Sequence, residues 1–495
     1  MRLSVAQSFR FRHSVSGEIK MIQSALAFQP SPSSSSICRS PNSGPTTSRA
    51  ALHTRFAERI IVNYELSRRL VSYQGNKAAP GFRWMRYKEG FSAQLVERLL
   101  SGSGPGAVLD PFSGIGTTAL TASRTGRRAT GVEIMPVGNL MARAITATAN
   151  GLDQRRLANA SKDLLGALAN GSPDPKHAFP HVRITQCAFS PQAEADIAKA
   201  RQFIAATADN ELATVLEAAC VAAIEEVSYT RKDGQYLRWD PRSGRTASTR
   251  LDKGQLPTLT EVLKRRLNQM IEDVPAVKRK YAGPPPELIN GSCLTKLQDL
   301  EAGTFDTVVT SPPYANRYDY TRTYALELAF LGHDEAGFKT LRQALLSATV
   351  ENRSKRDELR VAYAHSNQLS CLFAMVDENA ALNEVLNILR EHIEELGNRN
   401  VIRLLEHYFT EMAVVISELA RLVAPGGQVF MVNDNVRYHG EETPVDLILS
   451  DFAEQLGFCC KTIWALPRGK GNSSQQMGRF GRQEIRKCVY HWVRV

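Results

Sequence analysis

The sequence predicts an α/β fold built around a mostly parallel sheet. Short apolar strands and amphipathic helices alternate over residues 107–150, and the alternation resumes over residues 286–330 and 401–495. Parallel strands need crossover connections, which are usually helices, so this rhythm is typical of a parallel sheet covered by helices. The segments between these three regions are mostly helical, and we interpret them as insertions into the α/β fold.

The first α/β region supplies two of the expected parallel strands. Its apolar spacing gives, in order, a helix at 89–100, a strand at 107–109 (AVL), a loop at 110–116 (DPFSGIG), a helix at 116–125, a strand at 127–133 (RRATGVE) and a helix at 135–150. Gly126 can end the helix before it, because glycine adopts the left-handed conformation of a helix C-terminus without strain.

The later regions complete the sheet. They give a strand at 287–290 (ELIN), a helix at 293–300, a strand at 305–310 (FDTVVT), a helix at 411–423, a strand at 428–434 (QVFMVND), a helix at 444–458 and two final strands at 460–466 and 486–495. Two prolines directly after residue 311 forbid a helix and end the strand that begins at Phe305.

These patterns divide the chain into six segments. The first is rich in Ser, Arg and Pro and contains a single acid, Glu18, which predicts a disordered tail; a start codon placed too early, with Met21 as one alternative, or a transit peptide has the same bias. The segments are the tail 1–57, the first α/β part 58–150, a mostly helical insertion 151–285, the second α/β part 286–330, a charged helical insertion 331–400 and the C-terminal part 401–495.

Composition limits the classes of protein and partner that fit this chain. Lys and Arg number 61 against 50 Asp and Glu, a net charge of +11, which fits either a polyanionic partner or ordinary solubility charge. No apolar run reaches the roughly 20 residues that span a bilayer, so no membrane partner is expected. The eight cysteines form no CxxC pair and no Cys/His cluster, so neither a metal site nor a disulfide framework is expected, and a reducing cytoplasm fits this usage.

The glycine loop at 110–116 indicates a small-molecule site. A GxG loop between strand and helix lets backbone approach a ligand closely, and the three-glycine spacing of a dinucleotide loop is absent because Thr117 and Thr118 follow Gly116. Glu133 ends the next strand, where a carboxylate can accept hydrogen bonds from both hydroxyls of a ribose. The alternative for Glu133 is a solvated strand end.

Three motifs together resemble those of the DNA amino-methyltransferases, which transfer a methyl group from S-adenosyl-L-methionine to exocyclic nitrogens. They are DPFSGIGTT (110–118), GVE (131–133) and TSPPY (310–314). The resemblance implies a Rossmann-like class I methyltransferase sheet, mostly parallel with an antiparallel last strand. It assigns cofactor contacts to Phe91, Ser92, Asp110, Phe112, Gly114, Gly116, Thr117 and Glu133, and it places Ser292 where the family often has an acid facing the cofactor's adenine.

The same resemblance, and the chemistry of an exocyclic amine, make residues 311–314 the catalytic segment. The lone pair of such an amine is delocalised into the ring, and rigidly held acceptors around its hydrogens favour the more tetrahedral form that attacks a methyl group. Pro312 and Pro313 fix the backbone so that the Pro312 carbonyl can face the amine, and the Ser311 hydroxyl is a second acceptor. Tyr314 offers a flat face to an extruded base.

Two basic stretches are candidates for contact with double-stranded DNA. Residues 229–253 interleave Arg and Lys with aromatic side chains, and the glycine-rich loop 467–487 holds six basic residues and one acid. The alternatives are a solvated β-hairpin and an ordinary surface loop. The predicted DNA-binding residues are Arg231, Lys232, Arg238, Trp239, Arg468, Lys470 and Arg479.

Serine in the first position of SPPY is more typical of the family's N4-cytosine enzymes, so the favoured reaction is methylation of the cytosine 4-amino group at specific DNA sites. Adenine N6 methylation, methylation of guanine N2 in RNA, and a nucleic-acid-binding protein without catalysis are the alternatives. No cysteine follows a proline, as the nucleophile of a cytosine C5 enzyme would. The resemblance further implies a bacterial cytoplasmic enzyme, associated with the nucleoid through DNA, and a separate cognate restriction endonuclease.

Overall fold

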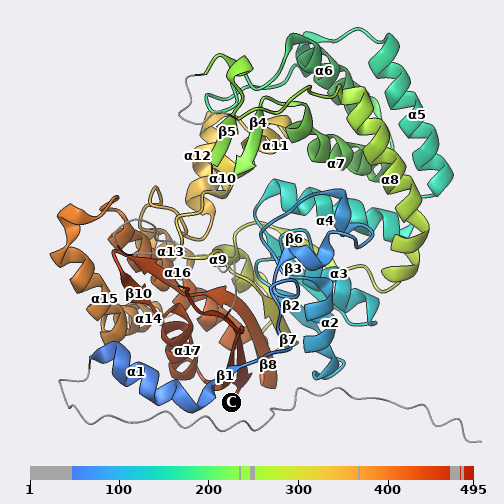
Figure 1. The fold of residues 1–495 in the computed structure, drawn as a ribbon. Coiled ribbons are helices and arrows are strands. Elements are labelled where there is room, and N and C mark those ends of the chain that lie inside the picture. Colours follow the sequence, from blue (N-terminus) through green and yellow to red (C-terminus); the bar gives the residue numbers. More distant parts are fainter. Residues whose placement is uncertain (1–46, 234–235, 246–250, 366–367, 469–479, 481–483) are drawn as a thin grey trace, which may run out of the picture. The chain divides into compact units, whose positions relative to one another are not determined.

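The computed structural model describes residues 47–233, 236–245, 251–365, 368–468, 480 and 484–495. Its centre is an eight-stranded sheet in the order β1-β11-β12-β8-β7-β2-β3-β6 (Figure 1). The strands are β1 Ile60–Val62, β2 Val108–Asp110, β3 Ala129–Glu133, β6 Glu287–Asn290, β7 Phe305–Thr310, β8 Val423–Asp434, β11 Phe458–Ala465 and β12 Lys487–Arg494.

The predicted α/β fold with a mostly parallel sheet is confirmed. β12 runs antiparallel to both of its neighbours, β8 and β11, and every other neighbouring pair of the sheet is parallel. Strands β2 and β7 are adjacent, with Val108 opposite Thr307 and Leu109 opposite Val308. The chain therefore reverses its strand order between β2 and β7, where the loops at their carboxyl ends meet and where open α/β sheets bind ligands.

Helices cover this sheet and form most of the remaining chain. They are α1 Ser48–Phe56, α2 Ala93–Ser101, α3 Thr117–Arg124, α4 Pro136–Asn150, α5 Gln154–Asn170, α6 Pro191–Ala206, α7 Asn210–Val227, α8 Leu259–Lys280, α9 Cys293–Lys296, α10 Tyr320–Thr323, α11 Ala325–Phe330, α12 Glu335–Ala344, α13 Arg356–Ala362, α14 Gln368–Asp377, α15 Ala380–Glu391, α16 Val401–Leu422 and α17 Val445–Gln455. In the described part of the chain, no helix combines the length and apolarity that crossing a membrane requires.

Two buried apolar clusters hold these layers together. One joins the sheet to α16 and α17, and α16 is buried along nearly its whole length, which explains its continuous run of apolar residues. The other joins α4 to α5, α7 and α8, so the insertion at 151–285 packs on α4 rather than on the strands (Figure 1). Since α4 also contacts β3 and β6, it links this helical insertion to the sheet.

The folded part of the chain begins earlier than its composition predicts. Helix α1 lies inside the segment 1–57 that we predicted to be disordered, and the sheet gains an edge strand, β1, that sequence patterning missed. Leu52 and Phe56 of α1 are buried, and Arg49 pairs with Glu384 at 2.7 Å. These contacts come from distant parts of the chain, which local composition does not show. Residues 1–46 lie outside the described residues.

Candidate active site

The catalytic segment and the glycine loop lie side by side at the carboxyl ends of β7 and β2. The Thr310 hydroxyl donates a hydrogen bond to Asp110 Oδ1 at 2.7 Å, and the Thr118 hydroxyl donates to the Val309 carbonyl at 2.9 Å. Threonines at the ends of both motifs thus tie the two loops together. The spatial relation that the motifs predicted is present.

A cavity opens beside these loops, and a second adjoins it. Tyr87, Glu89, Phe112 and Ser311 line both, so the two form one elongated site. Most of the predicted cofactor residues line these cavities. The first is lined by Phe112, Gly114, Glu133 and Ser292, and the second by Phe91, Asp110, Phe112 and Thr117.

The other two predicted cofactor residues, Ser92 and Gly116, fix the backbone conformation around the site. Ser92 is the N-cap of α2, where its hydroxyl accepts a hydrogen bond from the Leu95 amide and donates one to the Leu70 carbonyl. Gly116 begins α3 at a φ of 79°, and Gly114 has a φ of 54°. A Cβ on Gly114 would lie 3.1 Å from the Tyr87 ring, so glycine permits both the turn and the close approach of that ring.

Two carboxylates face the site from strand ends. Glu133 accepts hydrogen bonds from the backbone amides of Gly114 (2.5 Å) and Met135 (2.6 Å), which fixes its position against the glycine loop. Burial raises the pKa of Glu133 to about 7, since it outweighs these hydrogen bonds, and the charge of Asp110 adds to the rise. Burial likewise raises the pKa of Asp110 to about 6.

These residues fit S-adenosylmethionine. Glu133 can accept hydrogen bonds from ribose hydroxyls, and a cationic ligand would offset the cost of burying two carboxylates. Ser113 lines the second cavity, and its buried hydroxyl has no hydrogen-bond partner within the described residues, so a ligand's polar group could satisfy it. The Ser292 hydroxyl instead donates a hydrogen bond to the Ala344 carbonyl at 2.9 Å. Ser292 therefore contributes mainly to the shape of the cavity and less to hydrogen bonding with a ligand.

The catalytic segment is held by a chain of polar contacts. Ser311 and Pro313 line the first cavity, and Pro312 between them is buried. The Ser311 hydroxyl donates to the Tyr314 hydroxyl at 3.4 Å, and Lys487 Nζ lies 5.3 Å from the centre of the Tyr314 ring. Asp434, at the end of β8, holds Lys487 at 3.1 Å. Neither Lys487 nor Asp434 was predicted, because each lies far from TSPPY in the sequence.

A tyrosine cluster around Glu89 forms a wall of the site next to the glycine loop. Glu89 accepts a hydrogen bond from the Tyr318 hydroxyl at 2.6 Å and another from the Tyr324 hydroxyl, and the Tyr87 and Tyr324 rings stack at 5.4 Å. Tyr320 lines the first cavity beside Glu89. This wall was not predicted, although the sequence shows a tyrosine-rich run directly after TSPPY.

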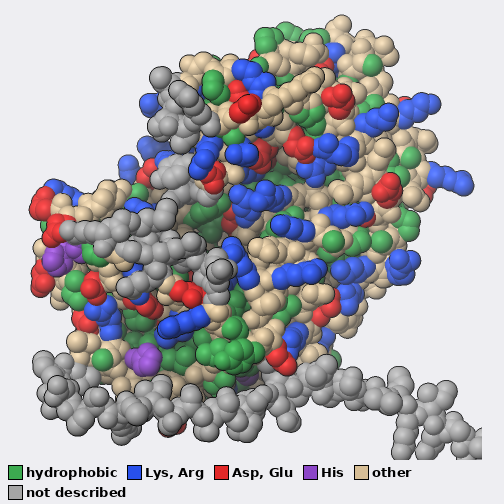
Figure 2. Space-filling view, viewed as in Figure 1, with side chains coloured by type: hydrophobic (Ala, Val, Ile, Leu, Met, Phe, Trp, Pro, Cys, Tyr) green, Lys and Arg blue, Asp and Glu red, His purple; other side chains and the backbone are tan. Residues whose placement is uncertain are grey.

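A third hollow, of about 980 Å³, is strongly basic. Tyr73 lines both this hollow and the second cavity, so it adjoins the site. Figure 2 shows Lys and Arg side chains across the middle of the face that it displays. The basic residues lining the hollow are Arg68, Lys77, Arg86, Lys88 and Lys487, with Asp434 the one acid among its lining residues.

The predicted DNA-binding residues have different surroundings. Arg231 and Arg238 are exposed on the hairpin of β4 (Thr230–Asp233) and β5 (Tyr236–Trp239), and Arg238 pairs with Asp233. Lys232 points inward, paired with buried Glu327 and 4.3 Å from the Tyr324 ring centre. Trp239 is also buried. Arg468 is exposed, and Lys470 and Arg479 lie outside the described residues.

Comparison with known proteins identifies the class. The chain is 38% identical to the type II methyltransferase M.BsoBI of Geobacillus stearothermophilus, over 96% of this chain and 99% of that protein. It is 40% identical to the type II methyltransferase M.AvaI of Nostoc sp., over 89% of this chain and 92% of that protein. No family model and no solved structure matches the chain. The chain belongs to the type II methyltransferases, the DNA-methylating enzymes of restriction–modification systems.

Proposed function

We propose that this protein methylates the exocyclic N4 of cytosine at a specific site in double-stranded DNA, with S-adenosyl-L-methionine as donor. The observation that supports this most directly is the position of Ser311 and Pro313, which line the same cavity as Gly114 and Glu133. A base presented to the catalytic segment there meets the proposed methyl-donor site without an intervening layer. We further propose that the protein works in the cytoplasm beside a separate cognate endonuclease.

The proposed mechanism follows from these positions. S-adenosylmethionine supplies an electrophilic methyl group when it is bound. Glu133 orients the ribose end of the site, and Asp110 holds the glycine loop against Thr310. The Pro312 carbonyl and the Ser311 hydroxyl accept hydrogen bonds from the target amine, which directs its lone pair toward the donor. Tyr314 stacks on the base after it leaves the duplex.

Cytosine rather than adenine is supported by Lys487 as well as by Ser311. Cytosine has two acceptors, N3 and O2, following its amino group, whereas adenine has N1 followed by a C–H group. An ammonium held beside Tyr314 is a donor suited to the cytosine edge. Burial opposes the charge on Lys487, but Asp434 and Tyr314 outweigh it and raise its pKa above the ordinary value, so the side chain is a cation.

The basic hollow is proposed to take the DNA backbone next to the flipped base. Apart from Lys487, its basic side chains, Arg68, Lys77, Arg86 and Lys88, offer phosphate contacts that carry no sequence information. Arg231 and Arg238, on the exposed hairpin, and Arg468 remain proposed contacts further along the duplex. Lys232 is better explained as the partner of Glu327, because moving it to DNA would leave a buried carboxylate unpaired.

The target base is tested by product analysis. DNA methylated by the purified protein is digested to nucleosides, and N4-methylcytosine is expected as the modified nucleoside. N6-methyladenine without N4-methylcytosine would refute the cytosine assignment while leaving the cavity assignments intact. Preference for structured RNA over duplex DNA in a competition assay would refute the DNA assignment itself.

Affinity for S-adenosylmethionine is expected to rise with pH between about pH 6 and pH 7 and to level off above. The pKa values of Asp110 and Glu133 in the free protein are raised to about 6 and about 7, so both groups are largely protonated below this window. A cationic ligand favours their ionised forms, so binding releases protons. Titration calorimetry in buffers of different ionisation enthalpy measures this release.

The raised pKa of Glu133 also determines how the stability of the folded protein changes with pH. Because folding raises the pKa of Glu133 from 4.5 to about 7, its contribution to stability is present below pH 4.5 and is lost as pH rises through 7. Bound cofactor should therefore stabilise the protein more at pH 8 than at pH 6. In Glu133→Gln, the upper step of the affinity profile should disappear. An affinity that is flat from pH 5.5 to pH 8 would contradict the electrostatic role.

A further inference from the structure

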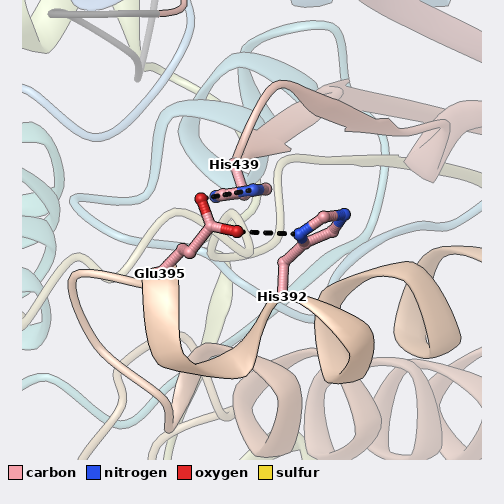
Figure 3. Close-up of side chains that lie close together, drawn as sticks. All are labelled: His392, Glu395 and His439. Atoms are coloured by element: carbon pink, nitrogen blue, oxygen red, sulfur yellow. Dashed lines mark hydrogen bonds and ion pairs between the residues drawn. The ribbon is translucent and has the colours of Figure 1, made fainter.

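A cluster of three metal-ligand side chains lies away from the proposed active site. His392 follows α15, Glu395 ends the short 3₁₀ turn Ile393–Glu395, and His439 lies in the turn between β9 (Val436–Tyr438) and β10 (Glu441–Thr443) (Figure 3). Their ligand atoms all lie within 4.8 Å of one another. The sequence predicted no metal site, because it contains no CxxC pair and no Cys/His cluster, and His439 lies far along the chain from the other two residues.

We infer that His392, Glu395 and His439 form a zinc-binding site. Two imidazoles and one carboxylate are a zinc donor set, and three protein ligands leave a fourth position for water. His392 Nδ1 lies 3.1 Å from Glu395 Oε1, close to the roughly 3.3 Å that separates ligand atoms around tetrahedral zinc with bonds of about 2.0 Å. His439 Nε2 lies 3.9 Å from Glu395 Oε2, which small side-chain rotations would shorten.

The surroundings hold these ligands in place. The His392 and His439 rings stack at 4.7 Å, and the Glu395 carboxylate lies beside both (Figure 3). His439 has a φ of 50° and Gly440 a φ of 81°, the positive values of a tight two-residue hairpin turn.

The site would join two distant parts of the chain. His392 and Glu395 belong to the helical insertion 331–400, and His439 belongs to a hairpin that reaches the catalytic loop. Next to His439, the Tyr438 hydroxyl donates a hydrogen bond to the carbonyl of Ala315, the residue after Tyr314, at 2.5 Å. Metal binding contributes directly to folding free energy. Zinc would therefore stabilise the β9–β10 hairpin that supports the proposed catalytic loop, without contacting the reacting atoms.

The test measures cobalt and zinc binding by untagged, full-length protein stripped with a chelator. Wild-type protein should bind one equivalent of Co²⁺ with visible bands of tetrahedral or five-coordinate geometry and without a thiolate-to-cobalt band. Zinc in excess should displace the cobalt and raise the Tm by about 3 °C. A thiolate band would mean that cysteines bind the metal and would overturn the assignment.

The variant His439→Asn removes the proposed metal ligand but preserves the turn. Asparagine suits the positive φ of this position, so the variant should match wild-type Tm in chelator but should lose both the cobalt bands and the rise in Tm with zinc. Glu395→Gln is a second ligand variant, and His177→Asn, in the 3₁₀ turn Pro175–His177, is a matched control that should behave as wild type. A wild-type cobalt spectrum that persists in His439→Asn and Glu395→Gln overturns the proposal.

Discussion

Tyr314→Ala is expected to lower kcat/KM for DNA methylation by about 100-fold or more while leaving the Kd for S-adenosylmethionine within about twofold. Base–aromatic stacking is worth about 1–3 kcal/mol, and loss of the ring also loosens the position of the amine relative to the donor. Tyr314 is not among the residues that line the two proposed cofactor cavities, which include Phe112, Gly114 and Glu133, so cofactor affinity should persist. Single-turnover methylation and equilibrium binding measure the two quantities.

Tyr314→Phe is the matched control for this prediction. It keeps the ring but removes the hydroxyl, which accepts a long and weak hydrogen bond from Ser311 at 3.4 Å and also contacts Lys487. Its rate should stay within about fivefold of wild type. If Tyr314→Ala methylates DNA at nearly the normal rate, the base does not stack on this ring, and the proposed base position is wrong.

Contiguous motifs allowed much of the fold and the cofactor side of the site to be predicted. DPFSGIGTT and TSPPY each combine a strand end with the loop that follows it. The parallel pairing of β2 and β7 therefore brings the two loops, and the groups they would bind, together. Glu133 was predicted as a site residue for the same reason, since it ends the strand next to β2, and it lines the first cavity. Where chemistry resides in one short segment, local pattern and sheet topology suffice.

The rest of the site is assembled from distant segments. Lys487 and Asp434 are opposite each other on β12 and β8, and Glu89 meets Tyr318 and Tyr324 only through tertiary packing. A single sequence shows no pairing between such positions. Charge runs have the same weakness, because they do not show which side chain turns inward.

Lys232 illustrates this limit. It lies in a basic stretch with exposed Arg231, yet its side chain is 7% exposed and pairs with Glu327. Residues 48–56 illustrate the converse, since a segment with tail-like composition forms α1 and buries Phe56. In both cases a tertiary partner decides the outcome.

Lys487→Met should produce the second large effect, a loss of about 100-fold in kcat/KM with cofactor affinity preserved. The substitution removes the cation beside Tyr314 and leaves the half-buried carboxylate of Asp434 without its ion-pair partner. Lys487→Gln keeps a donor toward the base and should retain more activity than Lys487→Met. Methylation rates are compared at a temperature where circular dichroism shows each variant to be folded.

Arg486→Met distinguishes a role at the base from a role in folding. Arg486 precedes Lys487 and pairs with buried Asp446 at 2.5 Å, so its loss also breaks an ion pair at the start of β12. Arg486 does not line the basic hollow, whereas Lys487 does. Arg486→Met should therefore lower the Tm but keep the methylation rate of its folded fraction. Equal loss of rate in the two variants would show that Lys487 acts through the stability of β12 and not on the target cytosine.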